Sequence, residues 1–378
     1  MTTTDYLSSD TSRLSRHLYW AYGQLSEPIY RVIEFITRCR NPLDPTKYDH
    51  HSKPVELAYR ALVPLMALAG ASRFSFRQLS MGAGCGIAFE IGVLLLHRVA
   101  CSYQSEKFIH VKGNIQPRNI DNPKIATWNI FGFPAGGNYS YGGCTPFCDR
   151  FEGIVRTIRE QKPDILVLQE CIDAKIPEWL IKEFKGDYAH FFIHNGPEKQ
   201  ALESGLMILT RCPVESYDFI PFTDNVFGMQ RGFAAMKIRA SGKEYVIIGT
   251  HLISGQPQVR QKQLQQIHEY AKKQECEAVI FAGDTNIHSN SEKEVAESNM
   301  NQVLSYYDTE PTCTNTFRLR PEERDPAQET IDQIAIVRSD VKSKEDVISQ
   351  PIIVPGYENS SKTARSDHHM LVATIRTY

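Results

Sequence analysis

The sequence predicts a mixed α/β domain over residues 119–378, preceded by a small helical region over residues 1–118. From residue 124 onward, short runs rich in Val, Ile and Leu are separated by turn residues, as expected for buried strands. Two segments, 146–161 and 260–274, place apolar residues at helical spacing, and each leads directly into a strand-like run. Because other runs follow one another without a helix between them, the pattern indicates mixed sheets, not a strict strand–helix alternation.

The strand-like runs share one feature, which is that each carries polar residues at an end. The runs are KIATWN ending at Asn129, DILVLQE ending at Glu170, VIIGTH ending at His251, AVIFAGDTN ending in Asp284 and Asn286, TIDQIAIV around Asp332, and SDHHMLVATI containing Asp367 and His368. Strand ends are where rigid elements deliver functional side chains. Carboxylate, amide and imidazole groups in these places favour a divalent-metal hydrolase.

Residues 1–118 have the character of a hydrophobic, helical region that contacts a membrane. Arginines alternate with Leu and Ile at mostly helical spacing near the N-terminus, and the apolar stretches 61–71 and 82–96 follow. Neither stretch is a clean transmembrane helix, because the first is short and the second contains Glu90. We expect residues 13–98 to bind a membrane surface; the alternative is a helical layer packed on the soluble domain.

Charge is divided unevenly between the two regions. Residues 1–118 contain 14 Lys and Arg against 9 Asp and Glu, whereas the remainder contains 28 against 35. An acidic catalytic region argues against an enzyme with a long basic groove, so nucleic acid is the less favoured partner. The nine cysteines are odd in number and dispersed, and no signal peptide is visible, so we expect reduced thiols at the cytosolic face of a membrane.

The ordered motifs TWN, LQE, SGLMILT, GTHL, GDTN, IDQI and SDHH resemble those of the endonuclease/exonuclease/phosphatase superfamily. The resemblance covers residues 124–378, and its specificity lies in the combination of motifs, since any one of them is weak. It implies a four-layered α/β sandwich and a metal-dependent phosphodiesterase or phosphatase activity.

The resemblance also implies roles for individual residues. Glu170 is expected to bind Mg²⁺, for which Mn²⁺ can substitute, with Asn129 beside it binding the metal or the phosphate. Asp367 is expected to complete the metal-binding or histidine-orienting shell. His368 is the expected general base that activates water, and Asp332 orients its ring. We expect the neighbouring His369 to point away from the site as a solvated histidine.

The remaining site residues are expected to act on water and on phosphate. Asp284 and Asn286 occupy alternate positions, so we expect their side chains on one side of an extended segment. There they are expected to bind an attacking water and a phosphoryl oxygen. His251 is expected to donate a hydrogen bond or charge to a non-bridging phosphate oxygen. The family usually has Phe where this chain has Thr285 and Tyr where it has Gln333, and both changes bear on substrate fit.

Segments around the motifs are similar to those of the neutral sphingomyelinases. They are SGLMILTRCPV at 204–214, RGF at 231–233 and GTHLISGQPQVRQKQL at 249–264. The resemblance implies hydrolysis of sphingomyelin to ceramide and phosphocholine at a membrane surface, with a sphingolipid or another phospholipid as substrate. Asp224 and Arg231 are candidates for a regulatory pair of that branch.

Three alternatives stay open at this point. They are a deoxyribonuclease-like endonuclease, a phosphoinositide or inositol phosphatase of the same superfamily, and a scaffold protein on an inactive hydrolase fold. The phosphatase would carry a Trp-Cys-Asp-Arg signature where this chain has residues 330–333, and the scaffold would lack catalytic residues that this chain contains. The sequence leaves the oligomeric state open.

Overall fold

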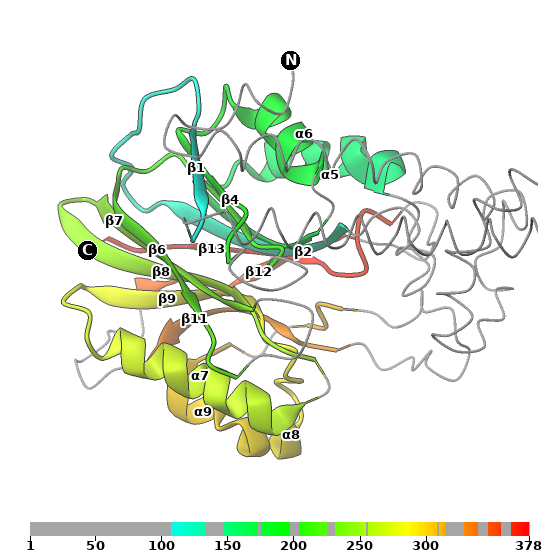
Figure 1. Cartoon of the computed structure of the whole chain (residues 1–378), viewed down its shortest axis with the longest axis vertical. Coiled ribbons are helices and arrows are strands. Elements are labelled where there is room, and N and C mark those ends of the chain that lie inside the picture. Colours follow the sequence, from blue (N-terminus) through cyan, green and yellow to red (C-terminus); the bar gives the residue numbers. More distant parts are fainter. Residues whose placement is uncertain are drawn as a thin grey trace, which may run out of the picture.

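Two β-sheets packed face to face form the centre of the protein in a computed structural model of the chain (Figure 1). The structure describes residues 107–132, 147–172, 175–196, 204–224, 231–254, 256–307, 310–313, 329–338, 347–356 and 364–377. The predicted membrane-contacting residues 13–98 lie outside the described residues. In the described part, no helix is both long and apolar enough to cross a membrane.

The first sheet has seven strands in the order β1-β4-β5-β3-β2-β13-β12. Their bounds are β1 Ile109–Lys112, β2 Lys124–Gly132, β3 Ile165–Cys171, β4 His190–Ile193, β5 Met207–Thr210, β12 Ile352–Val354 and β13 Met370–Thr374. β2 and β3 are parallel, and the other neighbouring strands are antiparallel. The parallel pair brings the ends of the TWN and LQE motifs to the same edge of the sheet.

The second sheet has six strands in the order β10-β11-β9-β8-β7-β6. Their bounds are β6 Val214–Pro221, β7 Gly232–Ala240, β8 Lys243–His251, β9 Ala278–Asp284, β10 Leu304–Ser305 and β11 Asp332–Val337. β8 and β9 are parallel, and β11 runs antiparallel to β9. The end of β9 therefore lies beside the end of β8 and the beginning of β11.

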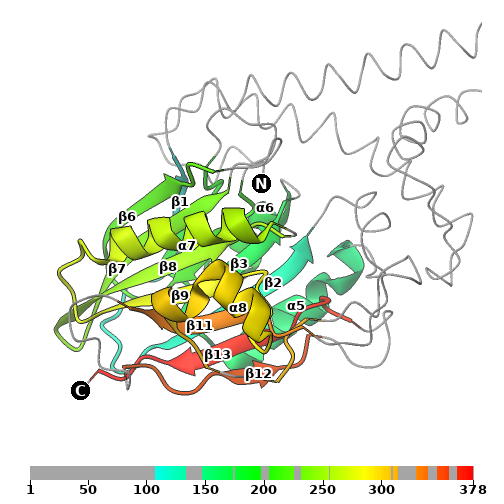
Figure 2. The ribbon, with the colours of Figure 1, turned by 90° about the horizontal axis from the view of Figure 1, so that it is seen from below.

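Helices cover the outer face of each sheet, so the described residues form four layers (Figures 1 and 2). α5 (Phe147–Gln161) and α6 (Lys175–Phe184) share an apolar core with the first sheet. α7 (Pro257–Ala271), α8 (Glu292–Ser298) and α9 (Met300–Val303) share another with the second sheet. The predicted four-layered α/β sandwich is confirmed.

A third apolar core lies between the sheets and fixes their distance. Gly249 of β8 faces the first sheet where the two sheets pack tightly. A Cβ atom at this glycine would lie 2.8 Å from Ile208 and 3.0 Å from Val167, closer than real Cβ contacts allow. This packing holds the two sets of strand ends in fixed positions relative to one another.

The helices and strands that flank the motifs differ slightly from their predicted bounds. The helix predicted at 146–161 is α5, one residue shorter, whereas the helix predicted at 260–274 begins and ends three residues earlier, as α7. Pro257 lies in the first turn of α7, where its missing N–H is not needed.

The predicted boundary at residue 119 is wrong, because the first sheet begins earlier. β1 pairs with β4, and its Ile109 and Val111 are buried under α5 and α6. β1 has only four residues, and two of them are buried and apolar. This alternation of apolar and polar residues is too short to distinguish a strand from the preceding hydrophobic region by sequence. The folded domain therefore includes residues on both sides of 119.

Candidate active site

Polar residues from both sheets meet at one edge of the sandwich. Asn129, at the end of β2 in the first sheet, donates a hydrogen bond from Nδ2 to Asp284 Oδ2, at the end of β9 in the second, at 3.1 Å. In the second sheet, Asp284 pairs in register with both His251 and Asp332. All eight predicted site residues come together here, through the contacts described below.

His368 and Asp332 form a buried pair in which His368 Nδ1 lies 2.8 Å from Asp332 Oδ2. Burial alone would lower the pKa of His368, but the Asp332 carboxylate overcomes this effect and raises the pKa well above its usual value. Since Nδ1 is engaged with Asp332, Nε2 remains for chemistry, and it lies 3.9 Å from Asp284 Oδ2. This is the arrangement of a general base with an orienting carboxylate.

Asp284 lies at the centre of the site. Its Oδ2 accepts the Asn129 hydrogen bond and lies 3.5 Å from His251 Nε2, while its Oδ1 accepts a hydrogen bond from the Asn286 backbone N–H at 2.8 Å. Burial, and then the nearby Asp332 carboxylate, raise the pKa of Asp284 to about 6. A cation bound beside Asp284 would stabilise its ionised form and so lower this pKa again.

Asn286 corrects the expectation of an extended GDTN segment. Its φ is +50°, in the left-handed region, because the Asp284 side chain closes a turn onto its N–H. The Asn286 side chain donates a hydrogen bond from Nδ2 to the Leu252 carbonyl at 2.9 Å. Asn286 thereby links the loop after β8 to the end of β9.

Glu170 offers the best evidence for a cation site. It has a φ of +59° at the end of β3, and its buried Oε2 has no hydrogen-bond partner among the described residues. Burial, and then the charges of Asp367 and Asp284, raise the pKa of Glu170 to about 7, although a hydrogen bond with Asn129 opposes this.

A hard divalent cation fits this set of groups. Carboxylate and amide oxygens are the donors that such cations prefer, and the unpartnered Oε2 of Glu170 is available as a ligand. A second buried carboxylate oxygen, Asp332 Oδ1, also lacks a partner in the described part of the chain. A bound cation would offset the repulsion among Glu170, Asp284 and Asp367.

More than half of the chain, residues 126–324, matches the sequence profile of the Endonuclease/Exonuclease/phosphatase family. The chain belongs to this family. Its members are hydrolases that act on phosphodiester bonds. The fold and the site described above are those of a family member with phosphodiesterase- and nuclease-like architecture.

Solved structures with the same fold include three informative examples. A beta toxin variant from Staphylococcus aureus with bound magnesium ions is 17% identical, with a TM-score of 0.51, and the match covers 68% of this chain and 100% of that chain. Sphingomyelinase C from Streptomyces griseocarneus is 19% identical, with a TM-score of 0.50 and the same two coverages. TDP2 of D. rerio, complexed with a single-strand DNA product, is 22% identical, with a TM-score of 0.52 and again the same coverages. A search of curated proteins found no match.

His251 is neutral in this family member. Burial, followed by the positive charge of Arg231 and of His368, lowers its pKa well below the usual value. His251 can therefore donate a hydrogen bond to a phosphate oxygen but does not supply a charge, which narrows the role expected from the sequence. Arg231 carries a positive charge nearby, and its guanidinium donates to the carbonyls of His251 at 2.9 Å and Leu252 at 2.6 Å.

Asp224 and Arg231, the candidates for a regulatory pair, each contact other residues in the described part of the chain. Asp224 forms an ion pair with Lys262, with Nζ and Oδ1 at 3.0 Å. The guanidinium of Arg231 holds the end of β8 in place through its two carbonyl contacts. Arg231 therefore acts as a support of the site, a role that the sequence did not reveal.

Three further supports were not predicted. Thr312 Oγ1 accepts hydrogen bonds from the backbone N–H groups of Ile331 and Asp332, at 3.2 and 3.1 Å. Ser366 Oγ donates to the Asn129 carbonyl at 2.6 Å, and Trp128 Nε1 donates to the His368 carbonyl at 3.0 Å. Ser366 and Trp128 belong to the SDH and TWN motifs, so those motifs contained a usable signal, whereas Thr312 belongs to none of the motifs.

Arg150 of α5 supports the last residues of β2, which follow Asn129. Its Nη1 donates to the Ile130 carbonyl at 2.9 Å and its Nη2 to the Phe131 carbonyl at 2.7 Å. Phe131 has a φ of +48°, so these bonds hold a backbone conformation that this residue type rarely adopts. An arginine on the buried side of an amphipathic helix was the available sequence signal.

His369 is not a solvated histidine, which corrects the expectation for this residue. It is half-buried, and its Nδ1 accepts a hydrogen bond from the Gly356 N–H at 2.9 Å. Burial lowers its pKa to about 4. Its contact with Gly356 anchors the segment that precedes β13 to the segment that follows β12.

A hollow of about 550 Å³ adjoins the site at Asn286 and extends along α7 and α8. Its lining includes Ser254, Arg260, His288 and Glu294, so its wall is largely polar. It offers space for the part of a substrate that lies beyond the reacting phosphate.

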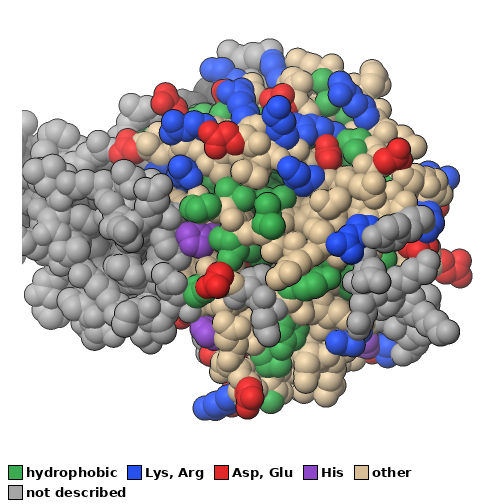
Figure 3. Space-filling model, turned by 180° about the vertical axis from the view of Figure 1, so that it is seen from behind, with side chains coloured by type: hydrophobic (Ala, Val, Ile, Leu, Met, Phe, Trp, Pro, Cys, Tyr) green, Lys and Arg blue, Asp and Glu red, His purple; other side chains and the backbone are tan. Residues whose placement is uncertain are grey.

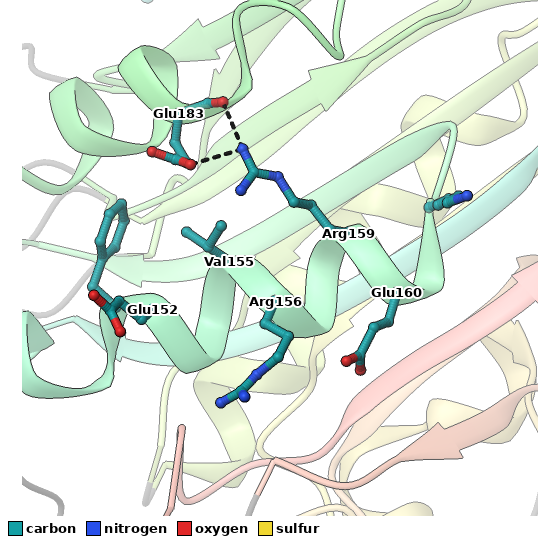
Figure 4. Close-up of a pocket in the computed structure, with 8 residues that line it drawn as sticks. Glu152, Val155, Arg156, Arg159, Glu160 and Glu183 are labelled. Atoms are coloured by element: carbon teal, nitrogen blue, oxygen red, sulfur yellow. Dashed lines mark hydrogen bonds and ion pairs between the residues drawn. The ribbon is translucent and has the colours of Figure 1, made fainter.

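A larger hollow of about 810 Å³ lies along α5 (Figure 4). None of the predicted site residues lines it. In Figure 4, Arg159 reaches from α5 to Glu183, and their ion pair has an N–O distance of 2.7 Å. Both side chains are substantially exposed, so this hollow is a solvated surface with charges of both signs.

Proposed function

We propose that the protein is a Mg²⁺-dependent phosphodiesterase that hydrolyses sphingomyelin to ceramide and phosphocholine at a membrane surface. The observation that carries the chemistry is the His368–Asp332 pair, in which His368 Nε2 lies 3.9 Å from Asp284 and beside carboxylates suited to a cation. The lipid substrate is supported by the sequence segments 204–214 and 249–264, which resemble the neutral sphingomyelinases.

In the proposed reaction, water attacks the phosphorus in line with the leaving oxygen of ceramide, which takes a proton from solvent as its bond to phosphorus breaks. In its neutral form His368 accepts the proton of this water at Nε2, and Asp332 stabilises the resulting imidazolium through Nδ1. Asp284 lies 3.9 Å from the same Nε2, close enough to orient the water by accepting its second proton in a hydrogen bond.

Hydrogen-bond donors stabilise the negative charge that develops on the phosphate. Neutral His251 and the amide of Asn129 are the donors of this chain that lie beside Asp284. A bound Mg²⁺, held by Glu170 with Asn129 and Asp367, would supply Lewis-acid stabilisation of the phosphoryl oxygens. Mn²⁺ has similar ligand preferences and is the expected substitute.

One face of the described domain carries charges of both signs. On the face seen in Figure 3, Lys and Arg side chains are interspersed with Asp and Glu, and no continuous basic stripe crosses it. A long nucleic acid is bound through many phosphates and would need such a stripe. On this face, the described residues therefore offer no track for a long nucleic acid.

The test is a parallel assay of the purified full chain with Mg²⁺. Sphingomyelin vesicles, phosphatidylcholine vesicles, single-stranded and plasmid DNA, and an inositol polyphosphate serve as substrates. We expect phosphocholine release from sphingomyelin, its loss in EDTA and in His368→Ala and Glu170→Ala, and its retention in Glu152→Gln, a change on the exposed side of α5. DNA cleavage without lipid turnover would refute the sphingomyelinase assignment.

Membrane contact through residues 13–98 and a location at the cytosolic face are part of the same proposal. β1 begins at Ile109, so a deletion that tests them should end at residue 106 and leave the sheet intact. We expect the full chain to co-sediment with vesicles and the chain without residues 1–106 to remain in the supernatant. Equal sedimentation of both proteins would refute the membrane role of this region.

A further inference from the structure

Cys313 lies against the general base and has no part in the proposed reaction. It is 4% exposed, and its backbone forms a bridge with His368 on one side and with Glu329 on the other. Ligand atoms of Cys313, Asp367 and His368 all lie within 4.8 Å of one another. The structure thus groups a thiol, a carboxylate and an imidazole at one point of the site.

We propose that Cys313, Asp367 and His368 form a zinc site that competes with the catalytic cation. The donor set contains one sulfur, one oxygen and one nitrogen, which is a combination that Zn²⁺ prefers and that Mg²⁺ does not. Three protein ligands leave a fourth position for water or a phosphate oxygen. Binding releases the proton of the Cys313 thiol to solvent, because zinc takes the thiolate as its ligand.

His368 is already oriented for this role. Its Nδ1 is held by Asp332 at 2.8 Å, so Nε2 is the nitrogen that a metal would take. A carboxylate that fixes the other nitrogen of a zinc-binding histidine is the common supporting group at such sites. Thr312 in turn holds the backbone N–H of Asp332, at 3.1 Å.

The geometry needs only a small adjustment. Donor atoms of a tetrahedral zinc site lie about 3.3–3.7 Å apart, given metal–ligand distances of about 2.0–2.3 Å. The three donors here lie within 4.8 Å of one another, so they must approach by no more than about 1.5 Å. Asp367 is only partly buried and can supply most of this movement by rotation of its side chain.

Zinc at this position would stop the reaction, and this consequence rests on the proposed function. It would occupy Nε2 of His368, which accepts the proton from water, and would take Asp367 away from the catalytic cation. We therefore expect zinc inhibition that excess Mg²⁺ relieves. Binding of zinc itself depends only on the three side chains.

The experiment uses the full chain and reads binding separately from activity. Co²⁺ replaces Zn²⁺ as a spectroscopic probe, because a thiolate ligand gives a charge-transfer band in the near ultraviolet. We expect this band in the wild type and in the control Cys276→Ser, a partly buried cysteine of the α7–β9 connection. We expect the band to disappear in Cys313→Ser and in Cys313→Ala, with Zn²⁺ affinity reduced at least about 100-fold.

Activity gives the second measurement, with each variant compared with its own zinc-free rate. Zinc should inhibit the wild type and Cys276→Ser at concentrations at least about tenfold lower than those needed for Cys313→Ser. A charge-transfer band that persists in both Cys313 variants would overturn the zinc site. A protein that shows the band and loses it with Cys313, yet hydrolyses no substrate, would retain the zinc site and refute the proposed function.

Discussion

Replacing Glu170 by Gln should stabilise the cation-free protein. The pKa of Glu170 rises from an ordinary value of 4.5 to about 7, first because it is buried and then because Asp367 and Asp284 are close. The folded state therefore binds this proton more tightly, so the free energy of unfolding falls as the pH rises from 4.5 to 7. At about 1.4 kcal/mol per pKa unit, the ionised carboxylate destabilises the fold by about 3 kcal/mol above pH 7.

Denaturant unfolding in EDTA measures this effect directly. At pH 8, Glu170→Gln should be more stable than the wild type by up to about 3 kcal/mol, because the amide has the shape of the carboxylate without its charge. The advantage should shrink through pH 6 and vanish below about pH 4, where the wild-type carboxyl is protonated in both states. Added Mg²⁺ should stabilise the wild type and have little effect on Glu170→Gln, since the variant lacks the charged ligand.

The matched control is Glu152→Gln, the same chemical change on the exposed side of α5. Its free energy of unfolding should differ from that of the wild type by no more than about 0.5 kcal/mol at either pH. If Glu170→Gln were no more stable than the wild type at pH 8 in EDTA, the carboxylate cluster would not be under electrostatic strain. A gain that did not depend on pH would point to packing instead of charge.

Three further changes test other parts of the site. Asp332→Asn should lower kcat about 10²–10⁴-fold. It should also shift the acidic limb of the pH–rate profile to lower pH, because His368 loses the carboxylate that raises its pKa. An unshifted limb would contradict the pairing of His368 with Asp332. Thr312→Val removes the acceptor for the N–H of Asp332 and should lower kcat about tenfold, with KM little changed, in steady-state assays. The control Thr223→Val, on an exposed loop, should leave both constants unchanged. Arg150→Met should reduce the free energy of unfolding by about 3 kcal/mol in denaturant titrations, because it leaves the carbonyls of Ile130 and Phe131 without their donor; a loss below about 1 kcal/mol would show that water replaces it.

The site could be predicted from the sequence to the extent that it lies on strand ends. Asn129, Glu170, His251 and Asp284 each close an apolar run, and parallel pairing within each sheet brings such ends to one edge. The family resemblance supplied the remaining step, since no periodicity shows that the two edges face each other. The hydrogen bond between Asn129 and Asp284 depends on that packing of sheet on sheet.

The residues that the sequence did not reveal act through the backbone. Thr312 holds N–H groups close to it in space but about twenty positions away in the chain, and Arg150 holds carbonyls at a similar separation. Every residue type has a backbone carbonyl, and nearly every type has a backbone N–H. A side chain that binds such a group therefore has no partner that the sequence can identify. The turn at Asn286 is a local case of the same problem, because an Asp-x-Asn sequence is compatible with both an extended strand end and an Asx turn.

The site is built at the expense of local stability, and two independent features show it. Phe131, Glu170 and Asn286 adopt left-handed backbone conformations, each at a strand end that carries a site residue. A non-glycine residue in this region costs roughly 1 kcal/mol or more, and the surrounding packing must impose it. The second feature is the set of carboxylates with raised pKa values at the same strand ends. Both features disfavour the cation-free fold, but only the repulsion among the carboxylates responds to a cation. Saturating Mg²⁺ should therefore increase the free energy of unfolding of the wild type by about as much as Glu170→Gln does. It should leave the backbone strain unchanged.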